Sequence, residues 1–389
     1  MATKPRIFSP TFVLLSAATL CFFMSFAILL PLLPQYVKSL GASATQLGVV
    51  IGVFSVSAIV LRPFVGREVD RRGRKLFTAL GIALSAIACL GYAVASGLGF
   101  LILVRLLHGM AIACFYPGAS TLAADLAPTS RRAEALSFFS MFLYVGNAIG
   151  PAVGQYLAAR EGFATTFVAA SALGFVGLVL ALLLREPDRT TSIAPRGPLI
   201  NRDSLFPAGV LALAAPAWAA LGFVPLYVEG QQGLVGIFFL TMSITVLFLR
   251  SFVGKLADRF SRGAVIIPGV FVVALSMVII STGPSRWAVI AGALAFGLGW
   301  GALWPGLLSL TIDRADEARR GSATGTFTAA FDLSFGLGSA LLGTILDFAG
   351  FGVMFLTSAA GATAAGMLFL SRGRSEAPRP AEAANYLPR

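Results

Sequence analysis

Charged side chains are scarce in this chain of 389 residues. Only 12% of the residues are Asp, Glu, Lys or Arg, whereas soluble domains contain roughly 25%. Apolar residues make up 57%, and the mean hydropathy is +0.86. This composition excludes a soluble globular protein. Apolar stretches long enough to cross ~30 Å of hydrocarbon recur from Thr11 almost to Leu370, so the sequence predicts an all-α membrane protein that crosses the bilayer many times.

Histidine and cysteine are also rare, with one and three residues respectively. Cys21, Cys89 and Cys114 lie in separate apolar stretches without paired spacing. This pattern indicates neither a disulfide framework nor a metal cluster, and it favours buried free thiols. The sequence also lacks a nucleophile with its base and a phosphate-binding loop. We therefore expect no enzymatic activity, no cofactor and no metal site, and an ATP-driven pump is disfavoured.

Gly, Pro and charged residues divide the apolar sequence into twelve predicted spans. They lie at residues 12–36, 45–65, 76–96, 98–122, 134–158, 164–184, 206–228, 233–256, 264–282, 287–312, 322–346 and 350–371. A short basic segment with Lys4 and Arg6 precedes the first span without a cleavage pattern, so this span is expected to be retained. The polar segment 185–205 separates six spans from six. The prediction is an N-terminal bundle at 1–184, a linker at 185–205, a C-terminal bundle at 206–371 and a tail at 372–389.

The basic residues are unevenly distributed between the loops. When successive loops are assigned alternately to the two sides of the membrane, 25 of the 29 Lys and Arg residues fall on the side that holds the termini and the linker. This count includes Arg62, which is placed in a loop that runs from Arg62 to Lys75. The exceptions are Lys38, Arg160 and Arg286 on the other side and Arg105 within the fourth span. Basic loops stay in the cytoplasm. The charge of +12 is therefore interpreted as a topology signal, with both termini cytoplasmic in a bacterial-type inner membrane, rather than as a nucleic-acid-binding surface.

The second half of the sequence repeats the first at an ungapped offset of 188 residues. The matched pairs include Arg62 with Arg250, Asp70 with Asp258, Arg74 with Arg262, Pro117 with Pro305 and Asp125 with Asp313. Because six spans separate the copies, both keep the same orientation in the membrane. This predicts two pseudo-symmetric six-helix bundles related by an axis along the membrane normal, with a binding site between them.

Residues 66–75 (Gly-Arg-Glu-Val-Asp-Arg-Arg-Gly-Arg-Lys) resemble the signature that the major facilitator superfamily carries between its second and third helices, except that Glu68 replaces a usual apolar residue. The resemblance covers essentially the whole chain and implies a secondary transporter that works by alternating access. A charged turn at a helix end can bind the opposite bundle and hold one face closed, although it can also be a simple cytoplasmic anchor. The candidate gating residues are Gly66, Asp70, Arg71, Gly73, Arg74 and Asp125, with Gly254, Asp258 and Arg259 in the second copy.

The fourth span carries Arg105 and His108, similar to a signature of proton-coupled members that usually has Gln at the histidine position. An arginine within hydrocarbon costs at least ~2.5 kcal/mol, so it must face a partner or a wet cavity, or snorkel to the interface. By resemblance, Arg105 tunes the proton affinity of a carboxylate or contacts an anionic substrate group. His108 lies on the same helical face, and it has either a structural hydrogen-bonding role or a role in proton transfer.

The fifth span contains Gly146, Gly150, Pro151 and Gly154, which resemble the glycine and proline signature of the antiporter branches, with Gln155 departing from it. The resemblance implies efflux. Glycines four residues apart also permit close helix packing, and a proline permits a bend, so ordinary packing is the alternative.

Asp332 lies about ten residues into the eleventh span, or ~15 Å along a helix, close to the membrane midplane. An isolated carboxylate at this depth is disfavoured as an anion, so it can bind and release a proton as the site changes access. Proton coupling or substrate binding is the favoured role of Asp332, and a structural hydrogen bond is the alternative.

The sequence predicts a mostly apolar cavity between the bundles, with Arg105 and Asp332 as its main charged groups. Its candidate lining residues are Phe26, Tyr116, Tyr144, Asn147, Trp218, Tyr227, Trp300, Trp304 and Phe331. Such a cavity suits a small amphipathic molecule, such as a drug, a metallophore or a sugar-like metabolite. The leading hypothesis is proton-coupled efflux by a monomer in the lipid bilayer. Proton-coupled uptake or facilitated diffusion of a nutrient is the alternative, and a receptor or scaffold without a transport cycle is a third reading.

Overall fold

The computed structural model describes residues 8–128, 131–186, 200–231, 233–259, 261–316 and 319–373, and within these ranges it contains helices and no strand. The helices are α1 (Pro10–Ser39), α2 (Ala44–Arg72), α3 (Arg74–Val94), α4 (Leu98–Leu126), α5 (Arg132–Leu182), η2 (Arg202–Ser204), α6 (Leu205–Ala220), η3 (Leu221–Phe223), α7 (Val224–Tyr227), α8 (Leu234–Arg259), α9 (Arg262–Ser281), α10 (Arg286–Arg314) and α11 (Arg320–Gly373). The predicted linker residues 187–199 and tail residues 374–389 lie outside the described ranges.

Two of these helices each contain two spans. Gly162 interrupts α5 with φ 80° and ψ 175°, and Gly350 interrupts α11 with φ 78° and ψ 175°. A side chain at such a positive φ would be strained, so glycine permits the sharp turn between two spans. The helices that the structure describes are therefore consistent with the twelve predicted spans. The seventh is irregular, because α6 continues through the 3-10 turn η3 into the short α7.

The internal repeat extends to the boundaries of the helices. Helix α10 begins and ends 188 residues after α4, and Gly350 follows Gly162 at the same offset. Ser43 caps the start of α2 by accepting the amide of Gln46, whose side chain accepts the Ser43 amide in return. Capping residues close in sequence thus determine where a helix begins or ends. The duplication repeats the same helix ends in the second half of the chain.

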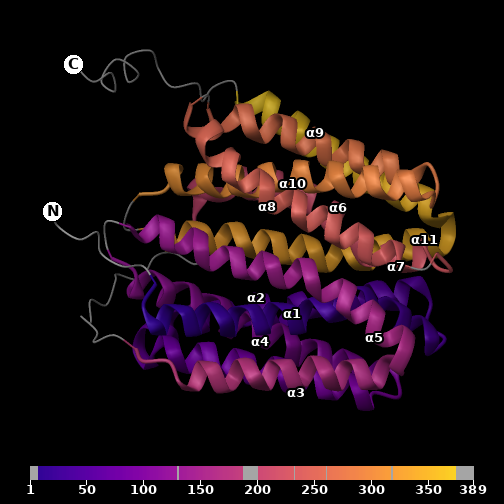
Figure 1. Cartoon of the computed structure of the whole chain (residues 1–389). Coiled ribbons are helices and arrows are strands. Elements are labelled where there is room, and N and C mark those ends of the chain that lie inside the picture. Colours follow the sequence, from indigo (N-terminus) through magenta and orange to yellow (C-terminus); the bar gives the residue numbers. More distant parts are fainter. Residues whose placement is uncertain are drawn as a thin grey trace.

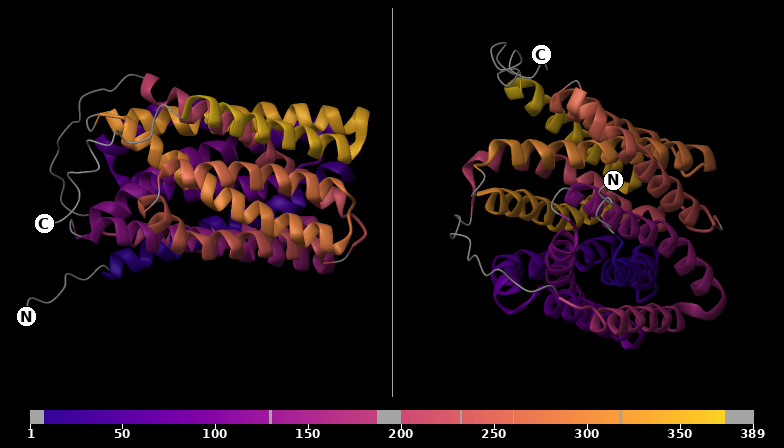
Figure 2. Two further views of the ribbon diagram at one scale, coloured as in Figure 1. Left: turned by 90° about the horizontal axis from the view of Figure 1, so that it is seen from above. Right: turned by 60° about the vertical axis from the view of Figure 1, so that its left-hand side comes forward.

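The helices form two bundles, α1–α5 and α6–α11 (Figure 1). Within the first bundle α1 packs along α5 and α3 along α4, and within the second α6 packs along α11 and α9 along α10. The bundles meet where α2 packs on α11 and α5 packs on α8. Figure 2 shows the same two groups of helices from two other directions. The two interfaces enclose the centre of the molecule.

We call the end of the molecule where α2 ends and α3 begins the basic end, and the end where α1 ends and α2 begins the far end. The bundles are in tight contact at the far end. A methyl group built on Gly343 of α11 would lie 2.9 Å from the carbonyl carbon of Ala44, and one built on Gly48 of α2 would lie 3.0 Å from that of Ser339. Only glycine permits these approaches.

Polar contacts also join the bundles at the far end. The carboxylate of Asp347 on α11 accepts the amides of Ala44 (2.8 Å) and Thr45 (2.7 Å) at the start of α2. Lys38 at the end of α1 forms an ion pair with Glu229, which follows α7. A carboxylate at a helix N-terminus is stabilised by the unpaired amides and the helix dipole. The far end is therefore closed in this conformation.

At the basic end, two glycines of the same face of α11 have open space beside them. Gly321 and Gly325 lie on the same stripe of α11 as Gly336 and Gly343, yet a methyl group built on either would meet nothing within 4 Å. Helices α2 and α11 thus touch at the far end and diverge toward the basic end.

Candidate functional site

A cavity of about 270 Å³ lies between the bundles and is lined by both of them. Six of the nine residues that the sequence analysis assigns to a substrate cavity line it: Tyr144, Asn147, Trp218, Trp300, Trp304 and Phe331. Sequence reasoning missed the other lining residues, which are Leu30, Leu143, Leu221, Gly222, Phe239, Met242, Ser243, Val246, Gly301, Pro305 and Phe335. These residues are ordinary members of apolar spans, so only the packing of the bundles identifies them.

Aromatic rings form one wall of the cavity. Trp300 and Trp304 are one turn apart on α10, with ring centroids 6.2 Å apart. The Trp218 ring of α6 lies 5.0 Å from that of Trp300, and the Phe331 ring of α11 lies 5.1 Å from that of Trp304. Three helices of the second bundle therefore present a continuous aromatic surface to a ligand.

None of the described residues that line the cavity is charged. The sequence analysis expected Arg105 and Asp332 to be the charged groups of the cavity, and this expectation is wrong for the present conformation. The lining has few polar side-chain groups. They are the hydroxyls of Tyr144 and Ser243, the amide of Asn147 and the indole N–H groups of Trp218, Trp300 and Trp304. Such a surface provides few, well-spaced hydrogen bonds on an apolar wall, which favours amphipathic ligands.

Three residues expected at the cavity lie elsewhere. The ring of Phe26 packs 5.0 Å from the imidazole of His108. The hydroxyl of Tyr227 donates to the carbonyl of Ile280 at 2.6 Å, and Tyr116 is an exposed residue of α4 that is absent from the lining. Helical register alone did not reveal which face of each span points to the centre.

Arg105 is buried between α4 and α2. Its Nε donates to the carbonyl oxygen of Val50 (3.0 Å) and its Nη2 to that of Ile51 (2.9 Å), while the guanidinium carbon lies 4.7 Å from the centre of the Phe54 ring. The side chain is 7% exposed, so it does not snorkel to the interface. Arg105 thus links α4 to α2 within the first bundle.

His108 is fully buried beside the α3 helix. Its Nε2 lies 3.2 Å from the hydroxyl of Ser85 and its Nδ1 lies 3.3 Å from the hydroxyl of Tyr92. Both ring nitrogens therefore have a hydroxyl partner, which is the arrangement that a structural histidine needs. A role in proton transfer stays a prediction.

Asp332 has a partner that the sequence analysis did not foresee. Nη1 of Arg62 lies 2.9 Å from Oδ2 of Asp332, and the Asp332 side chain is 8% exposed. The sequence analysis counted Arg62 as a loop residue and treated Asp332 as an isolated carboxylate, and both statements are wrong, because Arg62 lies within α2. The position of Arg62 inside the predicted span 45–65 was the signal that could have revealed the pair. A buried charge needs such a partner.

The charged turn at the basic end contains an ion pair that occurs in both bundles. Nε of Arg74 lies 3.1 Å from Oδ2 of Asp125, and Nε of Arg262 lies 3.0 Å from Oδ2 of Asp313. The first pair joins α3 to α4 in the first bundle. The second pair joins α9 to α10 in the second bundle. The repeat therefore preserves an ion pair as well as a sequence pattern.

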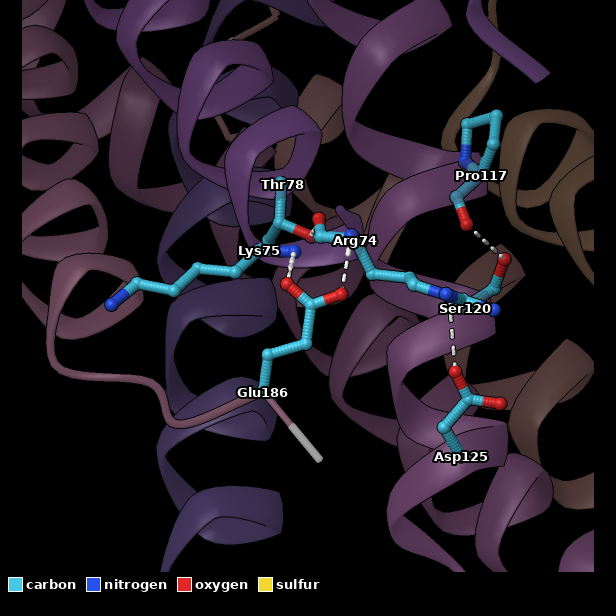
Figure 3. A network of polar contacts seen from close by, with 7 residues as sticks. All are labelled: Arg74, Lys75, Thr78, Pro117, Ser120, Asp125 and Glu186. Carbon is cyan, nitrogen blue, oxygen red and sulfur yellow. Dashed lines mark hydrogen bonds and ion pairs between the residues drawn. The ribbon is translucent and has the colours of Figure 1, made fainter. Parts of the chain in front are cut away.

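Glu186 completes the turn in the first bundle. Its carboxylate accepts the amides of Arg74 (2.9 Å) and Lys75 (3.4 Å) at the start of α3, as Figure 3 shows. Gly73, with φ 122°, provides no side-chain cap for this helix. Glu186 supplies the missing cap and ties the end of the sixth span to the third.

The other gating residues are placed only in part. Arg71 forms an ion pair with Glu68 at 3.1 Å, within α2 itself. The side-chain surroundings of Gly66, Asp70, Gly254, Asp258 and Arg259 lie outside what the structure describes. Their gating role stays a prediction.

The glycines of the antiporter-like segment pack α5 on α1. Methyl groups built on Gly146, Gly150 and Gly154 would lie 2.9, 2.7 and 2.7 Å from atoms of α1. Pro151 lies in the same helix. The glycines thus permit close packing inside the first bundle, while a link to antiport stays a prediction.

Comparisons with known proteins identify the family. The model of the Major Facilitator Superfamily matches residues 15–234 and 208–386. The chain belongs to the major facilitator superfamily. It is a multi-pass membrane transporter with the fold of this superfamily, and the resemblance noted from residues 66–75 is confirmed.

Relatives of this superfamily member include exporters. The chain is 28% identical over 389 residues to the staphylopine export protein of Staphylococcus aureus (strain Mu50 / ATCC 700699), covering 95% of this chain and 97% of the relative. It is 29% identical over 171 residues to the quinolone resistance protein NorA of Staphylococcus aureus, covering 44% of each chain.

Solved structures show the same fold at low sequence identity. The nucleoside transporter NupG matches with a TM-score of 0.78 at 14% identity, covering 93% of this chain and 99% of that chain. The human organic anion transporter MFSD10 matches with a TM-score of 0.68 at 18% identity, covering 94% of this chain and 100% of that chain. These likenesses concern the fold alone.

Proposed function

We propose that this transporter exports a small amphipathic organic molecule in exchange for protons, as a monomer in the inner membrane with both termini in the cytoplasm. The bundles, predicted to span residues 1–184 and 206–371, rock around the central cavity. The basic end faces the cytoplasm, so the present conformation receives substrate from that side.

The observation that carries this proposal is the uncharged aromatic cavity between the bundles. Indole and phenyl rings bind planar or apolar parts of a ligand, and Asn147 and Ser243 orient it by hydrogen bonds. A highly charged metabolite would lose its hydration there without a counter-charge. A sugar would need more polar contacts than the lining offers.

The outward direction is supported by the relatives. A relative that aligns over nearly the whole chain is named as an exporter of staphylopine, and another relative is named for quinolone resistance. Both names refer to small organic molecules. Quinolones and staphylopine are therefore the first substrates to test.

Proton exchange is assigned to Asp332. Its carboxylate pairs with Arg62 across the interface between the bundles, α2 on one side and α11 on the other. Protonation of Asp332 would remove the Coulombic attraction of this pair, which loosens the contact between the bundles. A proton bound at Asp332 thus changes the relative free energies of two arrangements of the bundles, and this is what coupling requires.

The test uses cells that express the parent protein, Trp300→Leu or Trp287→Leu, at matched membrane levels. Trp300 lines the cavity, whereas Trp287 is 77% exposed at the start of α10 and outside the lining, so it is a matched control. The expected result is lower quinolone accumulation with the parent and Trp287→Leu, and roughly tenfold weaker apparent affinity with Trp300→Leu because a stacking partner is lost.

A protonophore should raise the accumulation in cells with the active proteins. Higher accumulation with the parent than with empty vector would show uptake instead of export. Equal transport by Trp300→Leu and the parent would remove the central cavity from the substrate path.

A further inference from the structure

Equivalent positions in the two halves of the chain line the central cavity. Three residues of the first bundle line it together with the residues that lie 188 positions later, and these pairs are Leu30 with Trp218, Leu143 with Phe331 and Asn147 with Phe335. In each pair the second bundle has an aromatic ring where the first has an aliphatic or amide side chain. The helices thus place the same positions at the cavity from both sides, whereas the chemistry of the two sides differs.

The amide group of Asn147 has a defined orientation. Its Nδ2 donates to the carbonyl oxygen of Leu143 at 3.1 Å, one turn earlier in α5. Since a carbonyl oxygen can only accept, the amide nitrogen must face it, and Oδ1 is directed away from that carbonyl. Among the described residues, none donates to Oδ1 of Asn147. Asn147 therefore offers the central cavity a hydrogen-bond acceptor that has no protein partner within the described part of the chain.

This acceptor differs from the other polar groups of the lining. The indole nitrogens can only donate, and the hydroxyls of Tyr144 and Ser243 can either donate or accept. Among the described lining residues, Oδ1 of Asn147 is thus the one polar side-chain atom that can only accept. An acceptor on a ligand can be bound by several groups of the cavity, but this oxygen specifically requires a donor.

The requirement for a donor has a physical cost behind it. A ligand that fills the cavity displaces the water that otherwise reaches Oδ1 of Asn147. If the ligand brings no donor, the oxygen is buried without a partner, which lowers the affinity by roughly tenfold. A site that presents such a group rejects an analogue of the same shape that lacks the matching donor.

We propose that Asn147 determines the specificity of the central cavity by selecting aromatic molecules that carry an N–H or O–H donor on one edge. The donor binds Oδ1 of Asn147 on the first bundle, and the ring lies on the aromatic wall of the second bundle around Trp300 and Trp304. The ligand therefore contacts the two bundles with chemically different parts. This proposal deepens the proposed function and rests on it in assigning the central cavity to the substrate.

The experiment measures equilibrium binding to the purified protein in lipid nanodiscs, without any gradient. The probes are tritiated carbazole and unlabelled dibenzofuran, which have the same tricyclic shape but carry an N–H group and a ring oxygen, respectively. The affinity for dibenzofuran is obtained by competition, and both affinities are corrected for partition into protein-free nanodiscs of the same lipid. Carbazole is expected to bind the parent protein roughly tenfold more tightly than dibenzofuran.

Two variants at equivalent positions of the repeat test the role of Asn147. Asn147→Leu removes the acceptor at similar volume, so the affinity for carbazole should fall roughly tenfold while dibenzofuran binds at least as tightly as before. Phe335→Leu is the matched control in the second bundle, because it removes a ring of the cavity and leaves the acceptor in place. It should weaken both probes by a similar factor and keep the preference for carbazole. Retained binding of dibenzofuran by Asn147→Leu also shows that this variant is folded.

Equal affinities of the two probes for the parent protein would overturn the proposal, and so would a preference for carbazole that persists in Asn147→Leu. Absence of binding of either probe to the parent would overturn it as well. Because binding needs no transport, the result is independent of the export assay. A parent protein that prefers carbazole in nanodiscs but exports nothing from cells would refute the proposed export and leave the role of Asn147 in specificity intact.

Discussion

The closed far end depends on glycines that let α2 and α11 touch, and Gly343→Ala tests this directly. The added methyl group would lie 2.9 Å from the carbonyl carbon of Ala44 and 3.2 Å from the Cα of Gly48. Carbon atoms in contact prefer about 3.5–4.0 Å, so the helices must separate by roughly 0.5–1 Å. Both neighbouring atoms belong to the backbone of α2, which cannot move aside as a flexible side chain can.

The expected magnitude follows from the cost of overpacking. Overfilled contacts cost about 1–3 kcal/mol. If only the closed far end carries this cost, its population relative to the open form falls roughly 5- to 150-fold. Gly325→Ala is the matched control, because Gly325 lies on the same face of α11 and its added methyl group would meet nothing within 4 Å.

The assay measures the distance across the far end by electron spin resonance. Spin labels on Ser39→Cys at the end of α1 and on Phe348→Cys, an exposed residue of α11, report the separation of the bundles. The three native cysteines are first replaced, which requires a check that the protein still folds. Gly343→Ala should shift the distance distribution to longer values, while Gly325→Ala should match the parent. Identical distributions in all three proteins would refute the role of glycine contact in closing this end.

Three further predictions concern charged groups. Asp332→Asn should abolish the dependence of transport on a pH gradient, and Asp316→Asn, an exposed acidic control, should not; unchanged dependence in Asp332→Asn would exclude Asp332 from coupling. Glu186→Gln should lower the free energy of unfolding by about 0.5–1 kcal/mol in thermal denaturation, because the amide cap of α3 loses its charge, and an unchanged melting temperature would contradict this. Glu68 lies beyond the membrane-spanning part of α2, and the hydrogen bond from Arg72 holds the pKa of its carboxyl below the usual value. Its contribution to stability is therefore present above the unfolded-state pKa and lost as pH falls through the folded-state pKa, so the melting temperatures of Glu68→Gln and the parent should converge in acid and differ most at neutral pH.

Much of the architecture could be predicted from the sequence. Scarce charge and long apolar stretches determine a polytopic helical protein, since each span must satisfy its own backbone in lipid. The offset that relates Arg74 to Arg262 and Asp125 to Asp313 predicts the duplicated bundles, and the structure shows an ion pair in each copy. Residues 66–75 resemble the signature of the superfamily, and the family model confirms the membership.

The site was less accessible to sequence reasoning. A span in lipid is apolar on every face, so the period of a helix does not reveal which side points inward. Trp300 and Trp304 line the cavity as expected, whereas Phe26 and Tyr227 pack within their own bundles. The ring type alone did not distinguish these roles.

What the sequence by itself determined are properties of short segments: the spans, their duplication, their helix ends and the basic loops. What only the tertiary structure decided are contacts between distant segments. Arg62 and Asp332 lie in opposite bundles, so their ion pair depends on how α2 meets α11, and the uncharged lining of the central cavity depends on how the two bundles pack. Hydropathy acts on each span independently, but a contact between two spans depends on the rotation and tilt of both helices, which the packing of the whole molecule sets.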